Sequence, residues 1–137
     1  MLASMRTRPA VVVRDAEGLR RLPDRALARL DLGTGVLPLC IVRLRGEIRG
    51  VPDSCPHLGA PLSAGEFHGT AVTCPGHGRR YDMVTGRPVG VTGEPTAAYV
   101  VAVDHDEVQL RAAQPQRRRF GWWQRNRRKT RDGSATR

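Results

Sequence analysis

Four residues that could bind a metal stand in two short segments. Residues 55–57 read Cys-Pro-His and, after sixteen further residues, residues 74–77 read Cys-Pro-Gly-His. Thiolate is a soft ligand and imidazole a neutral, borderline one, so two of each suit a tetrahedral zinc ion or an iron–sulfur cluster. The spacing therefore predicts one metal site with the ligands Cys55, His57, Cys74 and His77.

The order of the four ligands bears on the choice between these two sites. In a zinc finger with two cysteines and two histidines, the cysteines form one pair and the histidines another. Here each segment carries one cysteine and one histidine. Mixed pairs allow one iron to take both cysteines and a second iron to take both histidines. The pattern therefore favours a two-iron cluster between two loops, although structural zinc would satisfy the same ligands.

The stretch VPDSCPHLGAPLSAGEFHGTAVTCPGHGRRYDMVTGRP resembles the Rieske family in its ligands and in their surroundings. This resemblance implies a 2Fe-2S cluster, with Cys55 and Cys74 on one iron and His57 and His77 on the other. The matched neighbours predict a supporting shell around the cluster. Its members are Gly59, Pro75, Gly76, Gly78 and Tyr81. Glycines allow tight wrapping of backbone N–H groups around the bridging sulfides, and prolines restrict the loops.

Departures from the family pattern predict a low reduction potential. High-potential members carry a loop disulfide and a serine bonded to the cluster, and those positions correspond here to Ala60, Gly76 and Arg79. Fewer hydrogen bonds to sulfur place the potential near the low end of a range of about −150 to +300 mV. Tyr81 stands where the family has a tyrosine bonded to a cysteine sulfur, which offsets part of this effect.

Short β-rich runs between Gly, Pro and Asp turns predict an all-β fold, a small antiparallel sandwich or barrel. The ligand loops would form a subdomain inserted between consecutive strands. Hairpin turns are expected at Arg45-Gly46 and His105-Asp106, and one helical turn within Asp15–Leu22. The expected strands are Val11–Val13, Ala26–Leu32, Leu37–Leu44, Glu47–Val51, Ala71–Thr73, Tyr99–Asp104 and Val108–Leu110.

Charge divides the chain into a predicted Rieske domain, residues 1–113, and a basic tail, residues 114–137. The tail holds nine lysine and arginine residues against one acid, while the domain holds fourteen against twelve. Such a block of like charge predicts disorder. The tail could steer docking onto an acidic redox partner, contact nucleic acid, lie on an anionic membrane, or only aid solubility.

Three further residues with reactive side chains are expected to take no part in the chemistry. Cys40 lies in an apolar run and is predicted to be a buried thiol, while His68 and His105 are predicted to be solvated. Two cysteines committed to metal leave no disulfide pair, which indicates a reducing compartment. With no signal peptide or membrane anchor recognisable in the sequence, we expect a soluble protein of the cytoplasm.

The resemblance implies a one-electron carrier between a flavin-containing ferredoxin reductase and a terminal oxygenase, a component with no substrate or catalysis of its own. Leu58, Pro75 and Gly76 would surround the exposed histidine edges and contact the partner. The small subunit of an assimilatory nitrite reductase is an alternative within the family. A zinc-stapled module with a nucleic-acid-binding tail is an alternative outside it. The sequence does not identify the electron acceptor, the potential or the oligomeric state.

Overall fold

The computed structural model describes residues 11–33, 37–56, 59–76 and 78–113, and they form two sheets with one short helix. The larger sheet has the strand order β1-β2-β3-β4-β8-β9, and the smaller has the order β5-β6-β7. The strands of the larger sheet are β1 (Val12–Val13), β2 (Leu27–Leu30), β3 (Leu39–Leu44), β4 (Glu47–Pro52), β8 (Tyr99–Asp104) and β9 (Glu107–Ala112). The smaller sheet contains β5 (Glu66–His68), β6 (Ala71–Thr73) and β7 (Arg80–Asp82). The helices are α1 (Ala16–Arg20) and the 3-10 turn η2 (Leu62–Ala64).

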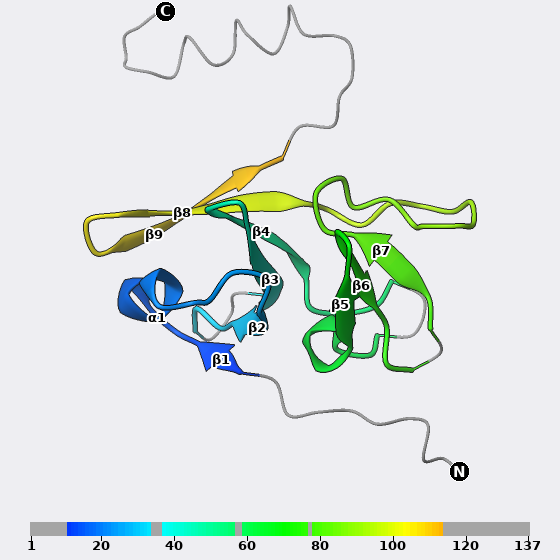
Figure 1. The fold of residues 1–137 in the computed structure, drawn as a ribbon, viewed down its shortest axis with the longest axis horizontal. Coiled ribbons are helices and arrows are strands. Elements are labelled where there is room, and N and C mark those ends of the chain that lie inside the picture. The colour runs from blue at the N-terminus through cyan, green and yellow to red at the C-terminus, as the bar shows by residue number, and fades with distance from the viewer. Residues whose placement is uncertain (1–10, 34–36, 57–58, 77, 114–137) are drawn as a thin grey trace, which may run out of the picture.

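The small sheet is an insertion in the large one, as the sequence predicts. Strands β4 and β8 are hydrogen-bonded neighbours, and the intervening chain leaves the sheet to form η2 and β5–β7 before it returns. Figure 1 shows β5–β7 at one end of the molecule and α1 at the other. The site segments therefore project from a base made by the large sheet.

Strand β3 separates two hydrophobic cores. All of its first four residues are buried, and successive side chains of a strand point to opposite faces. Leu39 and Ile41 pack in the core of the base with residues of α1, β2 and β8. Cys40 and Val42 pack in a second core that contains Cys55 and other residues of the insertion. One strand thus supports both the base and the cysteine site.

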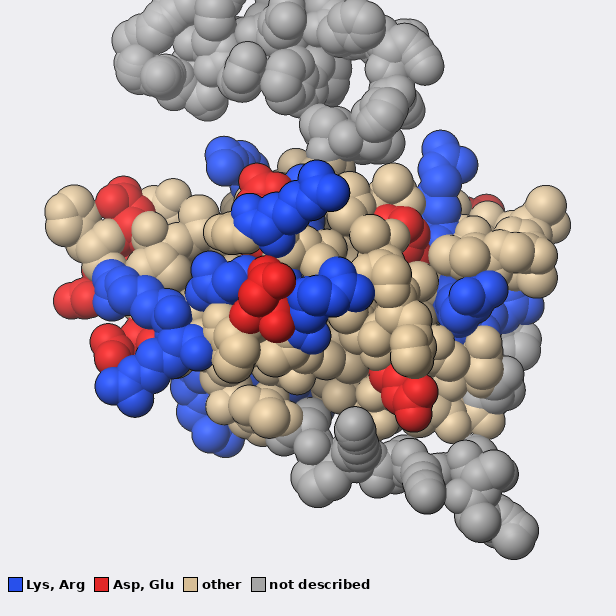
Figure 2. Space-filling model, viewed as in Figure 1, with Lys and Arg blue, Asp and Glu red and all other residues tan. Residues whose placement is uncertain are grey.

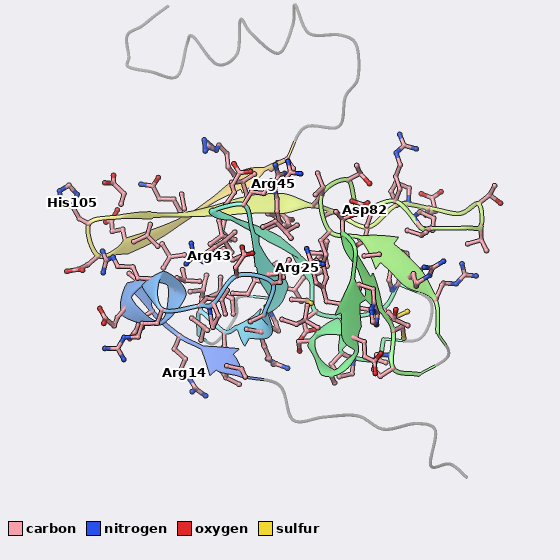
Figure 3. All side chains as sticks on the ribbon, in the orientation of Figure 1. Arg14, Arg25, Arg43, Arg45, Asp82 and His105 are labelled. Atoms are coloured by element: carbon pink, nitrogen blue, oxygen red, sulfur yellow. The ribbon has the colours of Figure 1, made fainter. Side chains whose placement is uncertain are left out.

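Both expected hairpins are confirmed. The β3–β4 hairpin turns at Arg45-Gly46 and the β8–β9 hairpin at His105-Asp106, with positive φ angles of 52° at Arg45, 82° at Gly46 and 58° at His105. Figure 3 shows His105 at the tip of its hairpin. The expected helical turn is α1, which begins after Asp15, whose carboxylate accepts a hydrogen bond from the Gly18 N–H at 2.9 Å.

Three features of the sheets differ from the expectation. Strands β5 and β7 were not among the expected strands, because each has three residues and a single apolar or aromatic side chain between polar neighbours. Strand β1 pairs with β2 in parallel, since α1 carries the chain back before β2 starts. All other strand pairs are antiparallel.

An arginine joins the base to the small sheet. Arg25 has a φ angle of 65°, which is uncommon for a residue with a side chain, and its N–H donates to the Arg43 carbonyl at 2.8 Å. Its guanidinium donates to the Gly69 carbonyl at 3.0 Å and lies 5.0 Å from the centroid of the Phe67 ring. Figure 3 shows Arg25 between the base and the small sheet. This contact orients the insertion relative to the base.

Candidate metal centre

The first ligand segment forms a closed turn that starts at Cys55. The Cys55 N–H donates to the Ala60 carbonyl at 2.7 Å, and the Gly59 N–H donates to the Cys55 carbonyl at 2.7 Å. Gly59 has a φ angle of 79°, a conformation that residues with a Cβ rarely adopt. The turn therefore depends on the glycine that the sequence pattern singled out.

The second ligand segment repeats this turn. The Cys74 N–H donates to the Arg79 carbonyl at 2.7 Å, and the Gly78 N–H donates to the Cys74 carbonyl at 3.0 Å. Gly78 has a φ angle of 78°. The two cysteines thus begin two turns with the same hydrogen-bond pattern and the same glycine geometry, four residues after each cysteine.

The two turns lie against each other. A Cβ placed on Gly76 would lie 3.6 Å from the Cβ of Ala60 and 3.6 Å from the Cys74 sulfur. The first distance falls within the range of about 3.5–4.5 Å between the Cβ atoms of a disulfide. Positions 60 and 76 are therefore placed as the loop disulfide of high-potential relatives would require. The Gly76 N–H also donates to the Cys74 sulfur at 3.3 Å.

Cys55 and Cys74, the two predicted cysteine ligands, are buried in the same core, each with 1% of its surface exposed, and neither forms a disulfide. Tyr81 from β7 lies beside them, 3% exposed, and forms a side-chain hydrogen bond with Cys55. Burial raises the pKa of the Tyr81 hydroxyl, and the charge of Cys55 raises it further, while the cation of Arg79 lowers it. The expected contact between Tyr81 and a cysteine sulfur is present.

The turn after Tyr81 is built by Asp82. Its carboxylate accepts hydrogen bonds from the Val84 N–H at 2.8 Å, the Thr85 N–H at 3.1 Å and the Thr70 hydroxyl at 2.7 Å. Figure 3 shows Asp82 at the edge of the small sheet. The Tyr-Asp pair of the sequence pattern therefore has two separate roles, a contact to the site and a structural turn.

The remaining predicted ligands, His57 and His77, and the predicted contact residue Leu58 lie outside the described residues. Consequently, within the described ranges no three candidate ligands gather into a metal site. Pro75 is half-buried and Gly76 exposed on the second turn. Cys40 is fully buried, and burial raises the pKa of its thiol well above the usual value, with a further contribution from the charge of Asp53. Cys40 is thus the buried thiol that was predicted, and His68 and His105 are exposed as expected.

Sequence reasoning missed a polar network at the start of the first turn. Asp53 lies two residues before Cys55 with its side chain fully buried, and it is hydrogen-bonded to Ser63 of η2. An acidic residue between a buried strand and a ligand was the available signal. Gly65 was also missed, since a Cβ there would lie 1.8 Å from the Thr73 carbonyl oxygen and only glycine allows this approach.

The described half of the site fits an iron–sulfur cluster, because two buried thiols start two matched turns with a backbone N–H directed at one sulfur. The family model of the Rieske 2Fe-2S domain matches residues 9–112. The chain therefore belongs to the Rieske family, whose cofactor is a 2Fe-2S cluster bound by two cysteines and two histidines. The identification made from the sequence, including its cofactor, is confirmed.

Similar curated proteins include apoptosis-inducing factor 3 of Mus musculus, 30% identical over 69% of this chain. The chain spans only 16% of the length of that protein. Ferredoxin CarAc of Metapseudomonas resinovorans is 32% identical over 56% of this chain and 72% of its own length. The ferredoxin component of the 2,4-dinitrotoluene dioxygenase system of a Burkholderia strain is 29% identical over 53% of this chain and 70% of its own length.

Solved structures of ferredoxins share the fold. The ferredoxin of carbazole 1,9a-dioxygenase from Nocardioides aromaticivorans superposes with a TM-score of 0.58 and 30% identity, covering 74% of this chain and 97% of that one. A complex of reduced oxygenase and oxidised ferredoxin in carbazole 1,9a-dioxygenase gives a TM-score of 0.58 and 26% identity, covering 72% of this chain and 90% of that one. In the described part of this chain, no helix has the length and apolar character needed to cross a bilayer.

Proposed function

We propose that this chain is a one-electron carrier that takes electrons from a flavin-containing reductase and delivers them to a terminal oxygenase. The proposal assigns Cys55, His57, Cys74 and His77 as the ligands of the cluster, which supplies one-electron chemistry when bound. The observation that carries the proposal is the pair of matched turns, which bring two buried cysteines into one core beside Tyr81.

The similar proteins support an oxygenase as acceptor. One curated relative is the ferredoxin component of a dioxygenase system. Two solved structures are of ferredoxins of carbazole 1,9a-dioxygenase, and one of them is a complex with the oxygenase. A reductase as electron donor is the counterpart that such a carrier needs. The match to apoptosis-inducing factor 3 covers 16% of that protein and gives no support to one acceptor over another.

The exposed surface of the two turns suits docking at short range. Pro56, Gly59, Pro61, Gly76 and Gly78 are all uncharged, and four of them are exposed at the turns themselves, with Pro61 directly after the first. Small uncharged residues leave little side-chain bulk between the ligand turns and a partner. We assign this surface, together with Leu58 and Pro75, as the contact region for the partner.

The assignment of residues 1–113 as the domain and 114–137 as a basic docking tail belongs to the same proposal. Its support is compositional, since eight of the ten net positive charges of the chain lie in the last 24 residues. Charge of one sign steers brief encounters with an acidic partner and makes their rate depend on ionic strength. Replacing the tail arginines with glutamine should therefore slow electron transfer and reduce its salt dependence, and an unchanged rate would remove this role.

The experiment that tests the function has two stages. Protein purified without air should contain about two irons per chain and, after reduction with dithionite, give the rhombic EPR signal of a Rieske cluster. The reduced protein should then lose its electron to an oxygenase of the ferredoxin-dependent class in a stopped-flow experiment. Transfer to an assimilatory nitrite reductase and not to an oxygenase would favour the alternative within the family. One zinc per chain and no signal would overturn the proposal.

A further inference from the structure

A fully buried carboxylate stands at the entrance to the first ligand turn. The Asp53 side chain has no exposed surface and follows directly on β4. One of its oxygens accepts a hydrogen bond from the Ser63 N–H at 2.6 Å, and the other accepts one from the Ser63 hydroxyl at 2.7 Å. Burying a carboxylate is costly unless it is hydrogen-bonded, and these two contacts give each of its oxygens a donor.

This network ties the two ends of the turn to the base. Asp53 precedes Cys55 by two residues, and Ser63 follows Ala60, which closes the turn, by three. The Asp53 N–H also donates to the Pro38 carbonyl at 2.9 Å, just before β3. The first turn is therefore held at its start and just after its end by one side chain.

The charge of Asp53 is only partly balanced. Arg29 of β2 is the one cation that pairs with it among the described residues, at 3.6 Å, and the Arg29 side chain is 36% exposed. A guanidinium exposed to this extent remains partly solvated and screened, whereas the Asp53 carboxylate has no exposed surface. The negative charge consequently acts on its surroundings in a low-dielectric region, and it contributes to the raised pKa of the Cys40 thiol.

We propose that Asp53 is a positioning residue for the cluster turn at Cys55 and that its fixed negative charge lowers the reduction potential. The chain length between the two residues keeps their Cα atoms within about 7 Å of each other. A negative charge so close opposes the addition of an electron, because reduction makes the cluster more negative. This inference rests on the assignment of Cys55 as a ligand in the proposed function.

The sign of the effect provides the test. D53N keeps the shape of the side chain and removes its charge. Its amide oxygen can still accept from the Ser63 N–H, while its NH2 group would donate to the Ser63 hydroxyl in place of accepting from it. R29Q removes the balancing cation. We expect D53N to raise the potential and R29Q to lower it. For D53N, the reduced-to-oxidised ratio at a fixed electrode potential should rise about threefold, which is about 28 mV for a one-electron couple. The control variant E107Q removes an exposed acid of the β8–β9 hairpin and should leave the potential unchanged.

Positioning is tested separately by retention of the cluster. S63A removes the hydroxyl donor and leaves the Asp53 charge in place, so iron should be lost to a chelator about tenfold faster, the equivalent of about 1.4 kcal/mol of activation free energy. The Tm of each apo variant reports any purely structural damage. An apo Tm equal to the wild type together with faster iron loss would support positioning.

The outcomes that would overturn the inference are specific to it. Shifts of the same sign for D53N and R29Q, or no shift beyond that of E107Q, would remove the electrostatic role. Unchanged iron loss in S63A would remove the positioning role. If D53N does not fold, R29Q and S63A still decide both points. A wild-type protein without iron would instead mean that the proposed function has failed, which is a distinct result.

Discussion

A disulfide between positions 60 and 76 should lock the two ligand turns together. The perturbation is the double variant A60C/G76C. The Cβ separation of 3.6 Å lies within the range for disulfides, and Gly76 is not among the glycines with positive φ. Among the described residues, its Cβ would meet the Ala60 Cβ and the Cys74 sulfur, both at ordinary contact distance. Position 76 therefore accepts a side chain without backbone strain.

The size of the effect follows from the closed segment. The bridge encloses about 15 residues, and a loop of that length gives about 3 kcal/mol of stabilisation in the chain-entropy treatment. For a domain of roughly 110 residues, this corresponds to a rise in Tm of about 10 °C. The bridge should also slow the release of iron, because the two turns can no longer separate.

The assay compares the Tm of the oxidised and reduced forms of A60C/G76C, each with its cluster, and mass spectrometry identifies the bridged peptide. The single variants A60C and G76C serve as controls and should show no dependence on oxidation. If the two introduced cysteines both remain free thiols under oxidising conditions, the placement of the turns is refuted. An oxidised form that melts no higher than the reduced form would refute the estimate of stabilisation.

Other changes test single contacts. Y81F removes the hydrogen bond to Cys55 and should lower the reduction potential by about 40 mV, the equivalent of about 1 kcal/mol, in a redox titration; an unchanged potential would exclude that contact. A Cβ at Gly86 would lie 2.1 Å from a backbone oxygen, so G86A should lower the free energy of unfolding in urea by more than 2 kcal/mol, whereas G46A, with similar φ and open space, should cost about 1 kcal/mol. Equal losses for the two would contradict the close approach. R25A should cost about 1–2 kcal/mol by the same measurement, since it removes the hydrogen bond and ring contact between base and small sheet.

The ligand turns were predictable because their chemistry is local. Each turn is defined within six residues by one cysteine and by a glycine four residues later. The structure shows the same backbone hydrogen bonds in both turns. The hairpins were predictable for the same reason, since each rests on a two-residue turn such as Arg45-Gly46 between apolar strands.

Features that depend on distant partners could not be predicted. The pairing of β5 and β7 with β6 needs only three residues each, and no periodicity develops over such a length. Asp53 looks like an ordinary turn residue in the sequence. Its burial is explained only by its contacts with Ser63 of η2 and Arg29 of β2, which are distant in the sequence. The positive φ of Arg25 likewise follows from what its side chain reaches, not from its neighbours in sequence.

Strand β3 contributes buried side chains to two separate hydrophobic cores. The core of the base contains none of the ligand cysteines, whereas Cys55 and Cys74 both belong to the other core. Removal of iron should therefore release amide protection in β5–β7 first, while amides of β2 and β3 continue to exchange slowly with deuterium. The base should therefore stay folded when iron is removed, and the cluster segment should lose order without iron and regain it when iron binds again.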